Sequence, residues 1–71
     1  MTTTTINAAR LDHECARRGL TARRLAELSG LTEAAISRLK RGHTRARPST
    51  IAAIAEALTA TPVLPGADLI L

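Results

Sequence analysis

Apolar residues recur along this chain at the spacing of helices that each bury one face. The clearest run has i, i+3, i+4, i+7 spacing and consists of Ile51, Ile54, Ala55 and Leu58. Shorter runs pair Leu25 with Leu28 and Ile36 with Leu39. The pattern predicts one helix over residues 8–18, a second from 21 to about 29, a third from 32, and a fourth capped by Ser49 or Thr50.

A glycine turn joins the second and third predicted helices. Gly30 follows the last apolar residue of its helix, where a left-handed conformation costs a residue with a Cβ about 1 kcal/mol. Thr21 and Thr32 stand where a hydroxyl can cap the first turn of a helix. Ala26 lies where the two helices must cross closely, which requires a small side chain. The segment has the pattern of a helix-turn-helix.

The third helix presents a largely polar face to its surroundings. Ile36 and Leu39 give this helix its one buried face. The residues on or near the opposite face are Thr32, Glu33, Ala34, Ser37, Arg38 and Arg41. These outward side chains can reach DNA.

The amino-acid composition reduces the number of functions that the chain could have. The chain has 71 residues, enough for one domain but too few for a deep enzymatic pocket. Its ten Lys and Arg exceed its six Asp and Glu, and it has no aromatic residue on which a base could stack. An acid-free run holds five of the cations: Arg38, Lys40, Arg41, Arg45 and Arg47. This run indicates a duplex DNA footprint, with a solvated basic loop as the alternative.

Several features argue against enzymatic, secreted or membrane roles. One cysteine cannot form an internal disulfide, and the threonine-rich start has no signal-peptide pattern. No apolar stretch approaches the roughly 20 residues that span a bilayer. Cys15 is predicted to face the core with His13 pointing elsewhere, so neither a metal site nor a thiol catalyst is expected. We expect a cytoplasmic protein that is not an enzyme and needs no cofactor.

The end of the chain breaks the helical pattern but stays apolar. Pro62, Pro65 and Gly66 preclude a long helix in residues 62–71. The apolar residues of this tail are Val63, Leu64, Leu69, Ile70 and Leu71. Folding back on the domain and burial in a dimer remain equal alternatives, as do a short helix from about Ala67 and an extended segment. Residues 1–61 are expected to form the DNA-binding domain, with residues 1–5 frayed.

Together these motifs resemble the Cro/C1-type helix-turn-helix family of phage repressors and small bacterial regulators. The resemblance covers roughly residues 11–58. It rests on Gly19-Leu20-Thr21, Leu25-Ala26, Ser29-Gly30-Leu31, Ile36-Ser37, Leu39, Arg41-Gly42 and Pro48-Ser49. It implies an all-α, compact bundle of four or five helices of the lambda-repressor-like type, with the third helix in the major groove. It also implies sequence-specific transcriptional control, usually by a dimer on operator DNA.

Carried onto this chain, the family's base-reading surface falls on Thr32, Glu33, Ala34, Ser37 and Arg38. Arg38 can bond bidentately to guanine, which is worth about 1–3 kcal/mol of discrimination. Its alternative roles are a phosphate contact and a solvent-facing arginine without a DNA contact. Ala34 can offer only a methyl group to thymine. Glu33 stands where many members have glutamine, and it can accept from cytosine or stabilise the helix dipole. Ala22 likewise replaces a glutamine that in many members bonds a phosphate.

Contacts to the DNA backbone are expected from a second set of residues, Thr21, Arg23, Arg41, His43, Thr44, Arg45 and Arg47. Such contacts fix the position of a protein on DNA without reading its sequence. Arg45 and Arg47 have a minor groove as their alternative target, since narrow A·T tracts attract arginine.

The function expected from these observations is repression by occupancy of an inverted-repeat operator, in the manner of a Cro-like or immunity-repressor-like protein. No small-molecule effector is expected, because the chain leaves no room for a ligand-sensing module. Three alternatives remain. The protein could be a controller of restriction-modification genes, an antitoxin or adaptor that binds a partner through the apolar tail, or a nonspecific nucleoid component.

Overall fold

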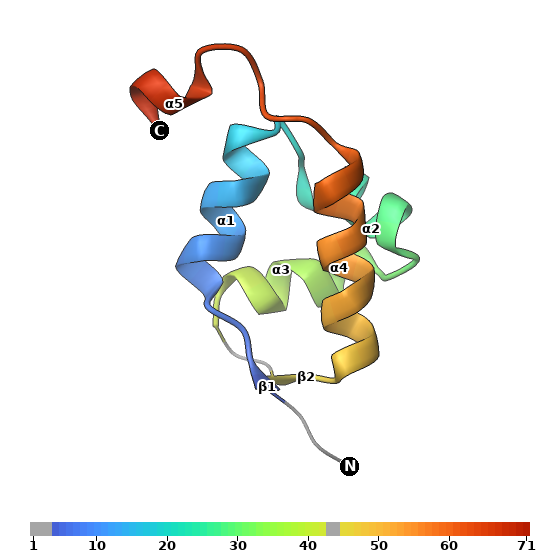
Figure 1. Ribbon diagram of the computed structural model, residues 1–71. Coiled ribbons are helices and arrows are strands. Elements are labelled where there is room, and N and C mark those ends of the chain that lie inside the picture. The colour runs from blue at the N-terminus through green and yellow to red at the C-terminus, as the bar shows by residue number, and fades with distance from the viewer. Residues whose placement is uncertain (1–3, 43–44) are drawn as a thin grey trace.

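The computed structural model describes residues 4–42 and 45–71 of the chain. Within these residues it contains five helices and one pair of short strands (Figure 1). The elements in chain order are β1 (Thr4–Thr5), α1 (Ala8–Arg17), α2 (Ala22–Ser29), α3 (Glu33–Lys40), β2 (Arg45–Ala46), α4 (Pro48–Ala60) and α5 (Ala67–Ile70). The predicted mostly helical bundle is confirmed.

Short polar side chains begin the first three helices. Asn7 accepts a hydrogen bond from the Arg10 amide at 3.0 Å and so caps α1. The Thr21 and Thr32 hydroxyls each accept from an amide three residues on, at 3.1 Å, and cap α2 and α3. Gly30 ends α2 in the left-handed conformation at φ 74°. The predicted caps and turn of this segment are confirmed.

The start of α4 differs from the sequence prediction. Arg47 is its N-terminal boundary residue and Pro48 occupies the first turn, with no side-chain cap. Ser49 and Thr50, predicted as caps, lie inside the helix. The physical reason is Pro48, whose fixed φ suits the first helical position and whose missing N–H would have no partner there.

The core lies where α1, α2, α3 and α4 meet. Leu25 and Ile36 are fully buried, and Cys15 of α1 is 1% exposed. Ala26 is also buried, as the close approach of α2 and α3 requires. Leu28, predicted as part of the apolar edge of its helix, is instead 40% exposed. The short α2 therefore buries the Leu25 and Ala26 side and leaves Leu28 on its outer margin.

The beginning of the chain is ordered by pairing with a distant segment. β1 runs antiparallel to β2, with Thr4 opposite Ala46 and Thr5 opposite Arg45. The prediction of a frayed start is wrong for these two residues. Within the connection between α3 and α4, Arg45–Ala46 forms the strand β2, and Ala46 packs in the core.

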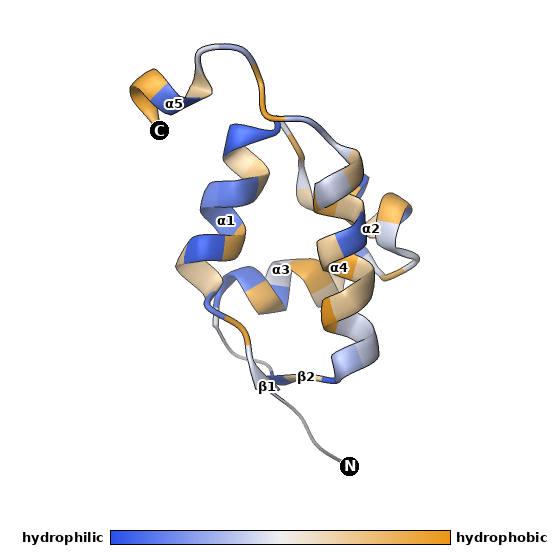
Figure 2. Ribbon diagram, viewed as in Figure 1, coloured by the Kyte–Doolittle hydropathy of each residue, from blue (hydrophilic) through white to orange (hydrophobic). Residues whose placement is uncertain are grey.

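The tail folds back on the bundle as far as Asp68, and its last three residues are exposed. The Leu64 amide donates to the Arg17 carbonyl at 2.8 Å, and the Leu64 side chain covers Gly19. Ala67 is buried, whereas Leu69 and Ile70 are 87% and 85% exposed. Figure 2 shows this apolar end of α5 standing beyond the bundle. Of the two conformations left open by the sequence, the short helix is the one adopted.

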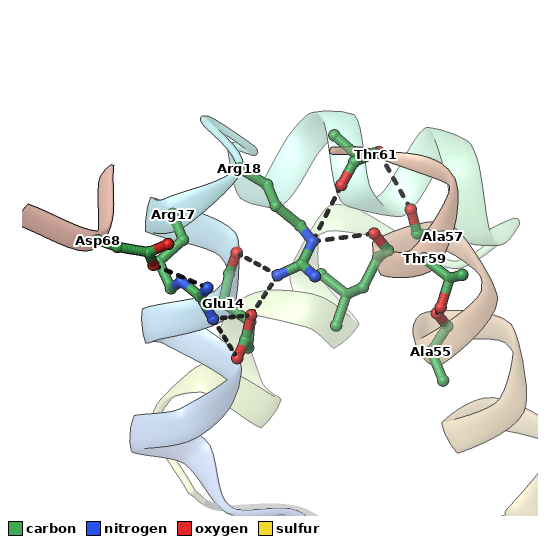
Figure 3. Close-up of polar contacts among 9 residues, drawn as sticks. Glu14, Arg17, Arg18, Ala55, Ala57, Thr59, Thr61 and Asp68 are labelled. Carbon is green, nitrogen blue, oxygen red and sulfur yellow. Dashed lines mark hydrogen bonds and ion pairs between the residues drawn. The ribbon is translucent and has the colours of Figure 1, made fainter. Parts of the chain in front are cut away.

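Two arginines at the end of α1 connect it to α4 and α5 (Figure 3). The Arg18 Nε donates to the carbonyls of Leu58 and Thr61 at 2.9 and 3.0 Å, which ties together the ends of α1 and α4. Arg17 reaches Asp68 of α5 at 2.9 Å. Both guanidinium groups also bond the Glu14 carboxylate. This cluster closes the end of the bundle opposite the two strands.

The Glu14 carboxylate should make folding sensitive to acid. The hydrogen bond from Arg18 holds its pKa below the ordinary value, and the charges of Arg17 and Arg18 act in the same direction. A carboxyl with a lowered folded-state pKa stabilises the protein above its unfolded pKa, about 4.3, and that contribution is lost as the pH falls through the folded value. We expect the melting temperature to fall more steeply from pH 5 to pH 3 in wild type than in Glu14→Gln. Equal slopes in thermal melts followed by circular dichroism would contradict this.

Candidate nucleic-acid interface

The outer face of α3 carries the residues predicted to read bases. Thr32, Glu33, Ala34 and Arg38 are exposed, and Ser37 is half-buried. Ile36 and Leu39 lie on the opposite side of the same helix, at 0% and 3% exposure. The helix is thus divided into a core face and a free face, as the spacing predicted.

The turn between α2 and α3 fixes the direction of this free face. The Leu31 amide donates to the Ala26 carbonyl at 3.1 Å, and the Thr32 cap starts α3 directly afterwards. α2 packs against α3 and also against α4 (Figure 1). The rigid frame holds α3 at the surface of the bundle.

A groove beside α3 brings together arginines from two parts of the chain. Arg38 of α3 lines it with Arg45 and Arg47, and its volume is about 320 Å³. Ser49 and Thr50, in the first turn of α4, also line this groove. None of the described residues that line it is acidic. The groove is a concentrated positive surface next to the free face of α3.

Sequence reasoning did not include Ser49 and Thr50 in the site. The signal that could have found them is Pro48, because a proline at the first helical position places the next two backbone amides at the open start of a helix. Such amides attract anions.

The basic run divides into paired and unpaired cations. Among the residues that the structure describes, Arg38, Arg41, Arg45 and Arg47 have no ion-pair partner, and all four are exposed. Lys40 differs, since its Nζ lies 3.8 Å from Asp12 and its side chain is only 20% exposed. The free positive charge therefore belongs to the four arginines and not to the whole run.

Two further residues that were predicted to contact the DNA backbone lie at the start of α2. Thr21 is exposed, and its hydroxyl oxygen is engaged as the cap of α2. Arg23 is 80% exposed and lies 3.5 Å from Glu27, which also pairs with Arg24 at 3.1 Å. Arg23 therefore shares the exposed Glu27 carboxylate with Arg24. His43 and Thr44 lie outside the described residues.

Cys15 sits in the core as predicted, away from this surface. It is 1% exposed, and burial raises the pKa of its thiol. A thiol with a raised pKa is a poor nucleophile at neutral pH. Among the described residues, no helix is both long and apolar enough to cross a membrane.

Comparison with known families shows which family the chain belongs to. A helix-turn-helix family model matches residues 14–63, from the middle of α1 to just beyond α4. The chain belongs to the Cro/C1-type helix-turn-helix family. Among curated proteins and solved structures, no match to the chain was found.

Membership of the helix-turn-helix family indicates the general function of the protein. The family binds DNA and regulates transcription, and such families are typically not enzymes. The matched region holds α2 and α3 with the turn between them, and also Arg45, Arg47 and α4. The family implies that the protein has DNA as a partner.

Proposed function

We propose that this protein is a cytoplasmic, sequence-specific repressor that acts by occupying operator DNA. The observation that carries the proposal is the groove in which Arg38, Arg45 and Arg47 meet beside the free face of α3. One helix face there can read base edges while unpaired arginines hold the flanking phosphates.

Base reading is assigned to the free face of α3, lying in the major groove. Arg38 is the principal reader, because a guanidinium matches the O6 and N7 acceptors of guanine. The other readers are Thr32, Glu33, Ala34 and Ser37. Their exposure and common helix face support this assignment.

Contacts to the DNA backbone are assigned to the residues around that face. Arg41, Arg45 and Arg47 have no ion-pair partner to give up, within the described parts of the chain, before they bind a phosphate. Thr21 and Arg23 lie at the start of α2, where backbone amides favour an anion. His43 and Thr44 complete the proposed set.

Selection of preferred duplexes from a random DNA pool, at two salt concentrations, tests the proposed function. We expect one motif at both concentrations, made of inverted half-sites about 34 Å apart, the spacing of one helical turn. Weaker overall binding at the higher salt is expected because phosphate contacts release counterions. Binding without a recovered motif would overturn the sequence-specific function and favour a nucleoid component.

The proposed repressor is a homodimer that buries its apolar tail against a second copy. Leu69, Ile70 and Leu71 are 87%, 85% and 52% exposed, and they form a continuous apolar end. Val63 and Leu64 lie nearer the bundle, where Leu64 covers Gly19. A symmetric dimer would match the two halves of an inverted repeat.

Replacing Leu69 and Ile70 with serine should convert the dimer to a monomer. The melting temperature at low protein concentration should change little, because neither side chain is buried within its own chain. Sedimentation equilibrium measures the association, and Leu28→Ser, an exposed leucine on α2, is the control that should remain dimeric. A wild-type monomer would instead favour an antitoxin or adaptor that offers this tail to another protein.

A further inference from the structure

Two segments far apart in the sequence meet at the edge of the arginine groove. β1 pairs with β2, and Arg45 of β2 lines the groove while Thr5 of β1 lies opposite it. In Figure 1 the two strands lie together at the end of the molecule away from α5. Thr4 and Thr5 are both exposed, so what they contribute to the fold here is their backbone.

The backbone is extended in β2 and at Arg47, which follows it, and this determines where Arg45 and Arg47 point. Successive side chains of a strand alternate between two sides, so residues two apart share a side. Arg45 and Arg47 are exposed, while Ala46 between them is 4% exposed and packs in the core. Both arginines are therefore directed outward, and both line the groove together with Arg38.

Different constraints hold these two arginines. Arg47 precedes Pro48, which restricts it to an extended conformation, and it has φ −72° and ψ 154°. Arg45 precedes Ala46 and not a proline, so no following residue restricts its backbone in this way. Three residues earlier, Gly42 is in the left-handed region at φ 77°. The extended conformation of Arg45 is held from outside, by pairing with Thr5.

We propose that β1 is a positioning element of the DNA interface. Its backbone holds Arg45 extended, so that the Arg45 guanidinium stands beside Arg38 and Arg47 ready for a phosphate. Arg47 does not depend on β1, because Pro48 fixes its conformation locally. This inference rests on the proposed DNA-binding function and adds to it a role for the first residues of the chain.

The test is a double-mutant cycle between β1 and each arginine. The strand variant is Thr4→Pro with Thr5→Pro, which removes both backbone donors of β1. We expect it to weaken operator binding about fivefold to tenfold at 0.1 M salt and to lower the salt slope by about 1, as Arg45→Ala should. Combining it with Arg45→Ala should add nothing, whereas combining it with Arg47→Ala should multiply the two losses.

Two controls separate positioning from contact and from stability. Thr4→Val with Thr5→Val keeps a strand-forming backbone and should retain wild-type affinity. Trypsin cleavage after Arg45 in the absence of DNA should be faster in the proline variant than in wild type or the valine variant. Thermal melts check that all variants remain folded at the temperature of the binding assay.

The outcomes distinguish this inference from the proposed function. If Arg45→Ala weakens binding but the folded proline variant does not, β1 has no positioning role and the proposed function stands. Equal losses in the valine and proline variants would mean direct contact by the threonines, which also overturns the inference. If wild type selects no DNA sequence, the proposed function has failed. Faster cleavage after Arg45 in the proline variant would then show only that pairing with β1 keeps β2 ordered.

Discussion

Replacing Arg38 with alanine is expected to abolish the preference for one base pair in each half-site of the operator. The guanidinium is exposed, has no ion-pair partner among the described residues, and lies on the free face of α3. A bidentate contact to guanine is worth about 1–3 kcal/mol of discrimination, which corresponds to about 5-fold to 150-fold in relative affinity. Competition between operators that differ at single base pairs measures this loss.

Lysine at position 38 separates base reading from phosphate contact. Arg38→Lys keeps the positive charge but lacks the planar fork that bonds two acceptors at once. We expect it to lose discrimination almost as fully as alanine while keeping more of the overall affinity. The alanine variant could instead keep full discrimination and lose affinity for every sequence. That result would mean that Arg38 contacts the DNA backbone and does not read a base.

Replacing Ile36 with alanine is expected to destabilise the fold severely. Ile36 is fully buried, and its side chain packs where α3 meets the rest of the core. Removing a buried isoleucine typically costs about 2–5 kcal/mol, because apolar contacts are lost and a cavity remains. A domain of this size has a free energy of unfolding of only about 4–11 kcal/mol, so the variant should lose a large fraction of its stability.

Urea denaturation followed by circular dichroism measures the loss at Ile36. Ala34→Ser is the control on the same helix, since Ala34 is exposed and its replacement should change stability by about 0.5 kcal/mol or less. A loss below about 1 kcal/mol for Ile36→Ala would mean that the surrounding side chains collapse into the space.

The helix-turn-helix could be predicted from the sequence because its determinants are local. Thr21, Gly30 and Thr32 each act within one turn of their own position, and the spacing of Ile36 and Leu39 defines the buried face of one helix. Local hydrogen bonds and periodicity follow directly from residue order. The predicted outward face of α3 was therefore found where expected.

The pairing of β1 with β2 and the course of the tail were not predicted because they depend on contacts between distant segments. Neither Thr4 nor Thr5 carries a strand signal by itself, and their order comes from pairing with Arg45 and Ala46. Such a pairing has no local pattern, since two residues are too few for alternation to be recognised. The course of the tail depends in the same way on Leu64 meeting Gly19 and Arg17.

The different role of Lys40 within the basic run could have been predicted from the sequence. Lys40 belongs to the basic run in sequence, yet it lies four residues after Ile36 and so falls on the inward side of α3. There it reaches Asp12 of α1. Helical spacing, applied to the charges as well as to the apolar residues, separates this lysine from the free arginines.

The pairing of β1 with β2 also has a practical meaning for anyone who labels this protein. A purification tag or dye joined ahead of β1 would leave the molecule at the edge that carries Arg45 and the arginine groove. One joined after α5 would leave from the other end of a bundle whose long axis measures 40 Å (Figure 1). A polyhistidine leader would therefore stand beside the arginine groove, whereas a fluorophore after α5 would stand beside the exposed tail.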